Sequence, residues 1–353
     1  MIYDLAIAGG GPAGLAAAIR AAQRGLSAIV LERSDGVPDK ACGEGLMPAG
    51  ARELSLLGAR VETAQPFFGI RYLQDHDVIE ARFAGGRSGL GIRRTMLSTA
   101  LRERAVELGA TLQRAAVRSA RAGADSIVVS TDAGEVTARL LVAADGLHSP
   151  LRRAAGLEVE GPPTPPRFGI RRHFQLLPWS DLVEVYWSAG VEAYVTPVGP
   201  RSVNVAFLSG RGAGFDELLT RFPALQEKLS GAEPDSETRG AGPLLQRVRS
   251  RRGDRLALLG DAAGYVDAIT GQGLSLAFAG AALLVEALPK DLAQDLAPAL
   301  RRYDRALRTR WLRYALPAHA LVALSRREGL RRLALRSVGA LPGAFGALVQ
   351  VVG

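Results

Sequence analysis

A glycine-rich turn between two short apolar runs constrains this chain more than any other feature. The run Ile2–Ala8 ends at the turn Gly9–Gly14, and an Ala- and Leu-rich stretch follows it as far as Gly25. A second apolar run covers Ser27–Leu31. Short apolar runs that end at glycines are typical of buried parallel strands, and an Ala-rich stretch favours a helix. The start of the chain therefore predicts a strand, a tight turn, a helix and a second strand.

The turn reads GGGPAG and fits the G-x-G-x-x-G pattern of dinucleotide-binding proteins. In that pattern the first glycine allows the tight turn, the second lets a pyrophosphate approach the backbone, and the third lets the helix pack on the strand. The N–H groups and the dipole of the helix attract the phosphates. A carboxylate at the end of the second strand is placed to bind the ribose hydroxyls. We therefore predict a cofactor site that includes Gly9, Gly11, Ala13, Gly14, Glu32 and the adjacent Arg33.

Two later motifs indicate which dinucleotide is bound. Residues 142–152 read VAADGLHSPLR and resemble the DG motif of FAD-dependent monooxygenases of the para-hydroxybenzoate hydroxylase type. Residues 258–263 read LLGDAA and resemble the GD motif of the same superfamily. The three motifs occur in the order found in that superfamily and cover most of residues 1–285. The resemblance implies that the chain binds FAD, with Asp145 in the site and Asp261 bonded to the ribityl chain.

The same resemblance implies further cofactor contacts. Arg94 stands where such flavoproteins place an arginine against FAD, although the adjacent Arg93 leaves the position open by one residue. Val117 is similar to a position whose backbone contacts adenine. Residues 269–274 read ITGQGL and predict a loop that enters a helix, whose dipole would stabilise the negative charge of reduced flavin. The residues of this loop expected at the flavin ring are Gly271, Gly273 and Leu274.

The segment Lys40–Leu46 reads KACGEGL and resembles the K-x-C-G segment of the geranylgeranyl reductase branch of the superfamily. In that branch the segment lies beside the isoalloxazine ring. Cys42 would then shape the flavin environment, and Glu44 would relay protons or orient the substrate. The alternative is that Cys42 is a small buried packing residue and Glu44 is solvated. We name Cys42 and Glu44 as candidate catalytic residues, and Cys42 as a cofactor contact as well.

The motifs leave the reaction open. Gly264 and Ala268 stand where the hydroxylases usually carry a proline and a histidine, and residues 192–197, EAYVTP, replace the aromatic box of the reductases. The W-x-W-x-I-P box and the catalytic lysine of flavin halogenases are missing, so halogenation is disfavoured. We expect a monooxygenase that uses NAD(P)H and O2 to hydroxylate or epoxidise a small molecule. The alternatives are an ene-reductase of the geranylgeranyl reductase type and a flavoprotein that donates electrons to, or matures, a partner protein.

The remaining patterns predict an α/β fold with a second, sheet-rich domain. A Rossmann-like FAD-binding domain would comprise residues 1–65, 93–160 and 245–296, and a mostly antiparallel substrate-binding sheet residues 66–92 and 161–244. The Gly- and Pro-rich residues 161–166 read as a linker, and residues 297–353 as a helical C-terminal region. One face of the sheet would offer an apolar pocket for an aromatic, polyketide-like or isoprenoid substrate. Its proposed contacts are Tyr186, Trp187 and Tyr194.

Composition and charge limit the class of protein. Hydrophobic residues make up 48% and charged residues 22%, which is typical of a folded globular chain. A single cysteine and four histidines argue against a disulfide framework and a Cys- or His-rich metal centre. Without a basic leader or a long apolar run, we expect a cytoplasmic protein.

The net charge of +9 arises entirely after residue 300, where eleven arginines face two carboxylates. This favours a solvated helical face, with weak peripheral contact to an anionic membrane as the alternative. No aromatic residues alternate with these arginines, which argues against nucleic-acid binding.

Overall fold

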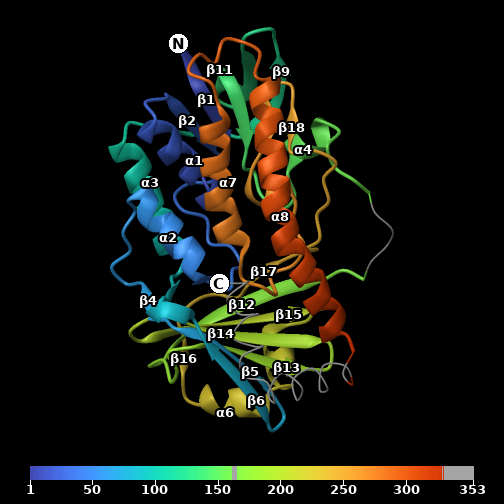
Figure 1. The fold of residues 1–353 in the computed structure, drawn as a ribbon. Helices are drawn as coiled ribbons and strands as arrows, with labels where there is room; N and C mark the ends of the chain where they lie inside the picture. The colour runs from blue at the N-terminus through green and yellow to red at the C-terminus, as the bar shows by residue number, and fades with distance from the viewer. Residues whose placement is uncertain (161–164, 328, 330–353) are drawn as a thin grey trace.

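The computed structural model describes residues 1–160, 165–327 and 329. Two large β-sheets lie one above the other in Figure 1, and the long helix α8 (Ala297–Ser325) runs beside both of them. The predicted α/β fold class is confirmed. Of the predicted linker, residues 161–164 fall outside the described part of the chain.

The upper sheet is built on parallel strands in the order β19, β11, β1, β2, β8. Ala8, at the end of β1, lies opposite Leu31 of β2 and Ala143 of β11, and Ala143 lies opposite Leu258 of β19. The central strands therefore end at the same edge of the sheet. The strands of this sheet are β1 (Ile2–Ala8), β2 (Ala28–Glu32), β8 (Thr111–Arg114), β9 (Val117–Ala122), β10 (Ile127–Thr131), β11 (Gly134–Ala143), β18 (Arg252–Gly253) and β19 (Leu256–Leu258).

Helices bury the apolar sides of this sheet. Gly11 is the N-cap of α1, and Pro12 takes the first helical position, where its missing N–H costs no hydrogen bond. Helix α1 packs against both α3 and α7, and α7 also contacts α2 and α8. The helices of this part are α1 (Pro12–Gln23), α2 (Pro48–Leu57), α3 (Arg94–Glu107), α4 (Pro150–Ala154), η2 (Gly260–Ala263) and α7 (Gly273–Ala287).

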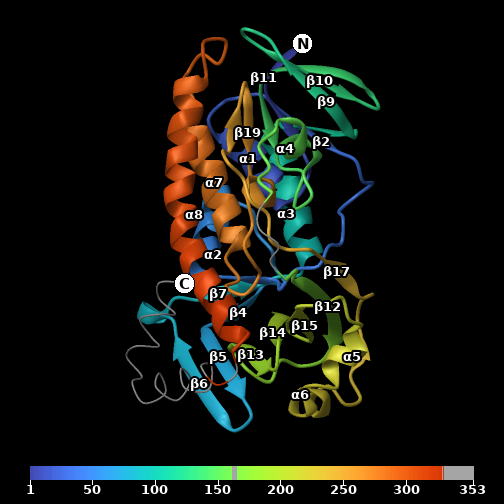
Figure 2. The ribbon, with the colours of Figure 1, turned by 90° about the vertical axis from the view of Figure 1, so that its right-hand side faces the viewer.

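The lower sheet has the order β16, β12, β15, β14, β13, β5, β6, with β17 added at β12. All of its pairs are antiparallel except β13 with β5. Its strands are β5 (Gly69–Gln74), β6 (Asp77–Arg82), β12 (Phe168–Gln175), β13 (Val183–Ser188), β14 (Val191–Gly199), β15 (Ser202–Ser209), β16 (Glu233–Pro234) and β17 (Arg239–Ala241). Two short helices that the sequence analysis did not predict, α5 (Phe215–Leu219) and α6 (Pro223–Lys228), cover its lower face (Figure 2).

The segment between the two large sheets does not belong to one sheet alone. At Phe68 the chain passes from the short strand β4 (Gln65–Phe67) to β5. Strands β4, β3 (Gly45–Leu46) and β7 (Gly89–Gly91) form a small separate sheet, and the 3-10 turn η1 (Ala84–Gly86) precedes β7. Residues 66–92 thus contribute to two sheets, and the proposed domain boundaries stay a prediction.

The C-terminal helix is long but mixed in character. Helix α8 has 29 residues, carries Pro317 in its interior and buries Tyr303, Leu307 and Tyr314 against the rest of the protein. Within the described residues, no helix combines the length and the apolar character that crossing a bilayer requires. Residues 328 and 330–353 of the predicted helical region lie outside the described part.

Candidate functional site

The three glycine-containing motifs meet at the carboxyl edge of the upper sheet. A Cβ atom added to Gly9 would collide with the backbone carbonyl of Ala144, which lies in the DG motif. A Cβ added to Gly260, in the GD motif, would lie 2.7 Å from the Cβ of Ala13. Gly9 and Gly260 both have positive φ angles, of 107° and 62°. Motifs more than 100 residues apart in sequence therefore touch, at the strand ends where α/β proteins bind ligands.

Glu32 closes this edge at the end of β2. Its Oε2 accepts a hydrogen bond of 2.7 Å from the N–H of Gly10, and its Oε1 accepts one of 3.0 Å from the N–H of Ser34. Burial raises the pKa of Glu32, but these hydrogen bonds outweigh it, so the pKa is lowered. An ionised carboxylate thus stands beside the glycine turn, as the sequence predicted.

Of the two adjacent arginines, Arg94 faces the glycine turn. Its Nη2 lies 3.6 Å from the position that a Cβ on Gly11 would occupy, whereas Arg93 pairs with Asp235 at 3.0 Å. Lys40, which the sequence analysis quoted but did not assign, belongs to the same charged cluster. Burial lowers the pKa of Lys40, and the positive charge of Arg94 lowers it further. Two cations therefore lie near the turn, as a pyrophosphate site requires.

Hydrogen bonds made by two of its own residues, Asp145 and Arg152, hold the DG motif in place. Oδ2 of Asp145 accepts a hydrogen bond of 3.2 Å from the N–H of Leu151, while its Oδ1 is buried without a partner in the described structure. Burial raises the pKa of Asp145. Arg152, almost fully buried, donates to Gln246 at 2.6 Å and reaches the carbonyl of Ala262 at 3.4 Å. The sequence analysis missed Arg152 as the residue that ties the DG motif to the GD motif.

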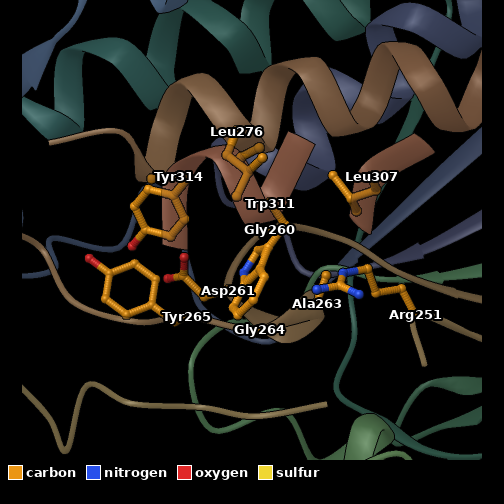
Figure 3. Close-up of a pocket in the computed structure, with 12 residues that line it drawn as sticks. Arg251, Gly260, Asp261, Ala263, Gly264, Tyr265, Leu276, Leu307, Trp311 and Tyr314 are labelled. Carbon is orange, nitrogen blue, oxygen red and sulfur yellow. The ribbon is translucent and has the colours of Figure 1, made fainter. Parts of the chain in front are cut away.

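Asp261 is half-buried between these elements. Burial raises its pKa, while Arg94 and Lys40 act in the opposite direction. Figure 3 shows Asp261 with Tyr265, Trp311 and other residues around a cavity of about 10 Å³. Such a cavity holds at most one water molecule. It lies between the GD motif and α8 and is too small for a flavin ring.

The loops 42–45 and 269–273 approach each other above the lower sheet. A Cβ on Gly271, whose φ is 65°, would lie 4.0 Å from the carbonyl oxygen of Gly45. The carbonyls of Cys42 and Gly43 accept hydrogen bonds of 2.9 Å from Asn204 and Thr196 of the sheet. The loop that resembles the reductase segment is therefore fixed to the sheet and lies next to the predicted flavin loop.

The candidate catalytic residues sit in different settings. Burial raises the pKa of the Cys42 thiol, although Arg94 lowers it in part. Glu44 is 3% exposed and accepts hydrogen bonds of 2.8 Å from the N–H of Arg94 and 2.5 Å from His173. The structure thus excludes a solvated Glu44. His173 was not anticipated, because it lies 129 residues away in the sequence.

The remaining predicted cofactor residues occupy the same edge. The N–H of Ala115, just before Val117, donates to the carbonyl of Glu32 at 2.9 Å. Arg33 is near enough to Lys40 to influence its charge. Gly273 begins α7, and Leu274 packs partly buried against the upper core.

The three predicted substrate residues do not share one face of the sheet. Trp187 packs against Tyr72, with a ring separation of 5.4 Å, and Tyr194 donates to the carbonyl of Ile269 at 3.3 Å, both on the upper face. Tyr186 packs on the opposite face, in the core with α5 and α6, and donates to Glu184 at 2.6 Å. Successive side chains of a strand point to opposite faces, so the neighbours Tyr186 and Trp187 cannot line one pocket. The expectation of a single aromatic face was wrong for Tyr186.

The site meets the requirements of a bound FAD. Three polar atoms near it are buried and lack a partner in the described structure: Arg94 Nε, Asp145 Oδ1 and Thr270 Oγ1. Buried polar atoms are normally paired, so such a group of them points to a missing polar ligand. At Gly11 a Cβ would find no atom of the chain closer than 3.6 Å. Packing within the described residues therefore does not require glycine at this position, which leaves room for a ligand to approach the backbone.

Comparison with known proteins agrees with an FAD site at the carboxyl edge of the upper sheet. A family model described as "FAD binding domain" matches residues 3–310. The chain is 30% identical to digeranylgeranylglycerophospholipid reductase 1 of Methanopyrus kandleri, over 86% of this chain and 85% of that protein. It is 27% identical to a menaquinone reductase of Mycolicibacterium smegmatis, over 77% of this chain and 72% of that protein.

Solved structures share the fold at lower sequence identity. A flavin-dependent brominase, Bmp2, superposes with a TM-score of 0.86 at 17% identity, covering 100% of this chain and 93% of that one. A geranylgeranyl bacteriochlorophyll reductase-like protein of Thermoplasma acidophilum superposes with a TM-score of 0.79 at 21% identity, covering 94% and 90%.

Proposed function

This chain belongs to the FAD-binding domain family, and we propose that it is an FAD-dependent ene-reductase that saturates a carbon–carbon double bond in an apolar, isoprenoid-type molecule. That it is an FAD-dependent oxidoreductase follows from the family. The direction of the reaction is our inference. The observation that carries it is the contact between the Cys42–Gly45 loop and the loop at Gly271, in a chain whose relatives include digeranylgeranylglycerophospholipid and menaquinone reductases.

Sequence motifs alone favoured hydroxylation or epoxidation of such a substrate. Both reactions need a water-poor site, and the aromatic group of Tyr72, Trp187 and Tyr194 on the upper face of the lower sheet is compatible with either. Reduction additionally needs a group that delivers a proton to the substrate, and we assign that role to the buried Glu44 beside Cys42. This is why we place reduction ahead of oxygenation.

The residues have separable roles in this proposal. Bound FAD supplies hydride chemistry, and NAD(P)H is the proposed source of its electrons. Arg94, Lys40 and the N-terminus of α1 bind the pyrophosphate, and Glu32 binds the ribose. Asp145 and Asp261 bind the remaining polar parts of the cofactor. Trp187 and Tyr194, with Tyr72, orient the apolar substrate and exclude water.

Anaerobic turnover distinguishes the candidate reactions. Reduced holoprotein is mixed under nitrogen with geranylgeraniol or with fully saturated phytanol as a matched control. We expect the flavin absorbance to return with the unsaturated alcohol only, and the product to gain two hydrogen atoms by mass spectrometry. A protein that stays reduced under nitrogen, and that incorporates labelled oxygen from O2 into a substrate, would be the monooxygenase instead. Turnover that depends on an added partner protein would favour the electron-donor alternative.

A further inference from the structure

A continuous hydrogen-bonded chain leads from Glu44 toward the surface of the lower domain. Oε2 of Glu44 lies 2.5 Å from Nε2 of His173, and Nδ1 of His173 lies 2.8 Å from Oγ of Ser236. Glu44 and His173 are 3% and 2% exposed, whereas Ser236 is only half-buried. The inner end of the chain adjoins the flavin-side loop, and the outer end is reached by solvent.

The surrounding hydrogen bonds determine the imidazole tautomer. A serine hydroxyl accepts two hydrogen bonds and donates one. Oγ of Ser236 accepts from Arg171 Nη1 and from the backbone N–H of His173, each at 3.1 Å. With both lone pairs used, it cannot also accept from an Nδ1–H group. The one proton of the hydroxyl has two acceptors within reach, Nδ1 of His173 at 2.8 Å and the carbonyl of Glu237 at 3.1 Å. In either case Nδ1 is left without a proton, so the neutral His173 carries its proton on Nε2, directed at Glu44.

Glu44 is held at the inner end by its backbone as well as by its side chain. Its φ is 59°, in the left-handed region that is uncommon for a residue with a side chain. Its Oε1 is fixed by the N–H of Arg94, and its own N–H approaches Cys42 Sγ at 3.4 Å. Uncommon backbone conformations persist where the surroundings impose them, and they concentrate at functional sites.

We propose that Ser236, His173 and Glu44 form a proton relay from solvent to the flavin site. In one transfer, His173 passes its Nε2 proton to Glu44 Oε2 and takes a proton on Nδ1 from Ser236. Ser236 takes a proton from solvent water, which leaves hydroxide in the solvent, and Glu44 passes its proton to the substrate carbon that receives no hydride. Saturating a double bond requires one hydride and one proton, and the relay supplies only the proton. Bound FAD would supply the hydride, and a reduced nicotinamide would be the source of its electrons. The link to substrate reduction rests on the proposed function, while the relay itself is a property of the site.

The tautomer is tested without the cofactor. The chain has only four histidines, so imidazole ¹⁵N–¹H spectra of the apoprotein can be assigned by substitution, with the exposed His76→Gln as the control. We expect an Nε2–H tautomer for His173 and a strongly downfield proton that moves upfield in Glu44→Gln. An Nδ1–H tautomer, or a proton signal that does not respond to Glu44→Gln, would overturn the relay.

The transfer is tested by proton uptake when bound FAD is photoreduced, followed with a pH indicator. We expect His173→Gln to slow the uptake at least about tenfold relative to wild type and His76→Gln, with FAD content unchanged. Equal rates in His173→Gln and His76→Gln would overturn the proposal. If uptake depends on His173 but no unsaturated alcohol is ever reduced, the relay stands and the proposed function fails.

Discussion

Gly11 differs from the other two glycines of the turn in what surrounds it. A Cβ on Gly9 or Gly14 would collide with the backbone of the protein itself, whereas a Cβ on Gly11 would meet nothing closer than Arg94 at 3.6 Å. The φ of Gly11 is −77°, which any residue adopts. The fold therefore requires glycine at positions 9 and 14, and we infer that at position 11 the ligand does.

This difference predicts opposite effects of the same substitution. Gly11→Ala should change the free energy of unfolding of the apoprotein by less than about 1 kcal/mol, because the helix N-cap cost and the lower entropy of the unfolded chain nearly cancel. It should nevertheless weaken FAD binding severely. Gly9→Ala, the matched variant, should destabilise the apoprotein itself. Urea unfolding of the apoproteins and FAD titration check both expectations. Equal FAD affinity in Gly11→Ala and wild type would contradict this assignment.

At the scale of elements, a buried ion cluster joins the two parts of the protein. Arg167, which precedes β12, pairs with Glu192 of β14 at 2.6 Å and with Asp267 of the loop before α7 at 2.8 Å. All three side chains are buried. Burial raises the pKa of Glu192, and Arg167 opposes that rise. The cluster thereby fixes the lower sheet to the chain segment that leads to the Gly271 loop.

Replacing Arg167 by a neutral residue should leave the buried carboxylates of Glu192 and Asp267 without a positive charge to pair with. Arg167→Met should therefore lower the free energy of unfolding by roughly 3–5 kcal/mol. The control is Arg82→Met, which breaks the exposed pair with Asp181 and should cost no more than about 1 kcal/mol. Denaturant unfolding near pH 7 measures both values. A loss for Arg167→Met as small as that for Arg82→Met would show that the cluster does not stabilise the fold.

Local sequence patterns predicted those strands, turns and helices whose own residues form a recognisable pattern. The glycine turn, the apolar runs and the motif order were enough to anticipate the upper sheet and its cofactor edge. Contacts between distant residues carry no local signal, so the Glu44–His173 pair was missed. The helices α5 and α6 were missed because each has only five or six residues. Strict alternation along β13 could have separated Tyr186 from Trp187, since neighbouring residues face opposite sides.

Over the molecule as a whole, much of the net positive charge lies on helix α8, which carries six arginines and a single acidic residue. Arg301, Arg305 and Arg308 precede Leu312 and Leu316 at helical spacing on α8, and all five are exposed, with Leu316 at 68%. None of these arginines forms an ion pair within the described part of the chain. An exposed basic stripe that ends in leucines suits the surface of an anionic bilayer.

We accordingly expect weak, salt-sensitive binding to phosphatidylglycerol vesicles and none to phosphatidylcholine vesicles. Each arginine near an anionic surface contributes about 1 kcal/mol, so replacing Arg301, Arg305 and Arg308 by Glu should abolish sedimentation with the vesicles. Replacing the exposed Arg87, Arg114 and Arg121 by Glu changes the net charge equally and serves as the control. Equal losses in both triple variants would mean that only net charge matters, and the helix would then be a solvated face.

We infer that the distant motifs and the Cys42 loop form one FAD site, with the flavin ring at that loop. Because Cys42 is the single cysteine and burial raises the pKa of its thiol, its alkylation by iodoacetamide in the apoprotein should be slow at pH 8 and faster at higher pH. We predict that saturating FAD suppresses this alkylation further, whereas ADP, which fills only the adenosine and pyrophosphate part of the site, leaves the rate unchanged. An alkylation rate that FAD does not alter, or that ADP lowers equally, would contradict the placement of the ring.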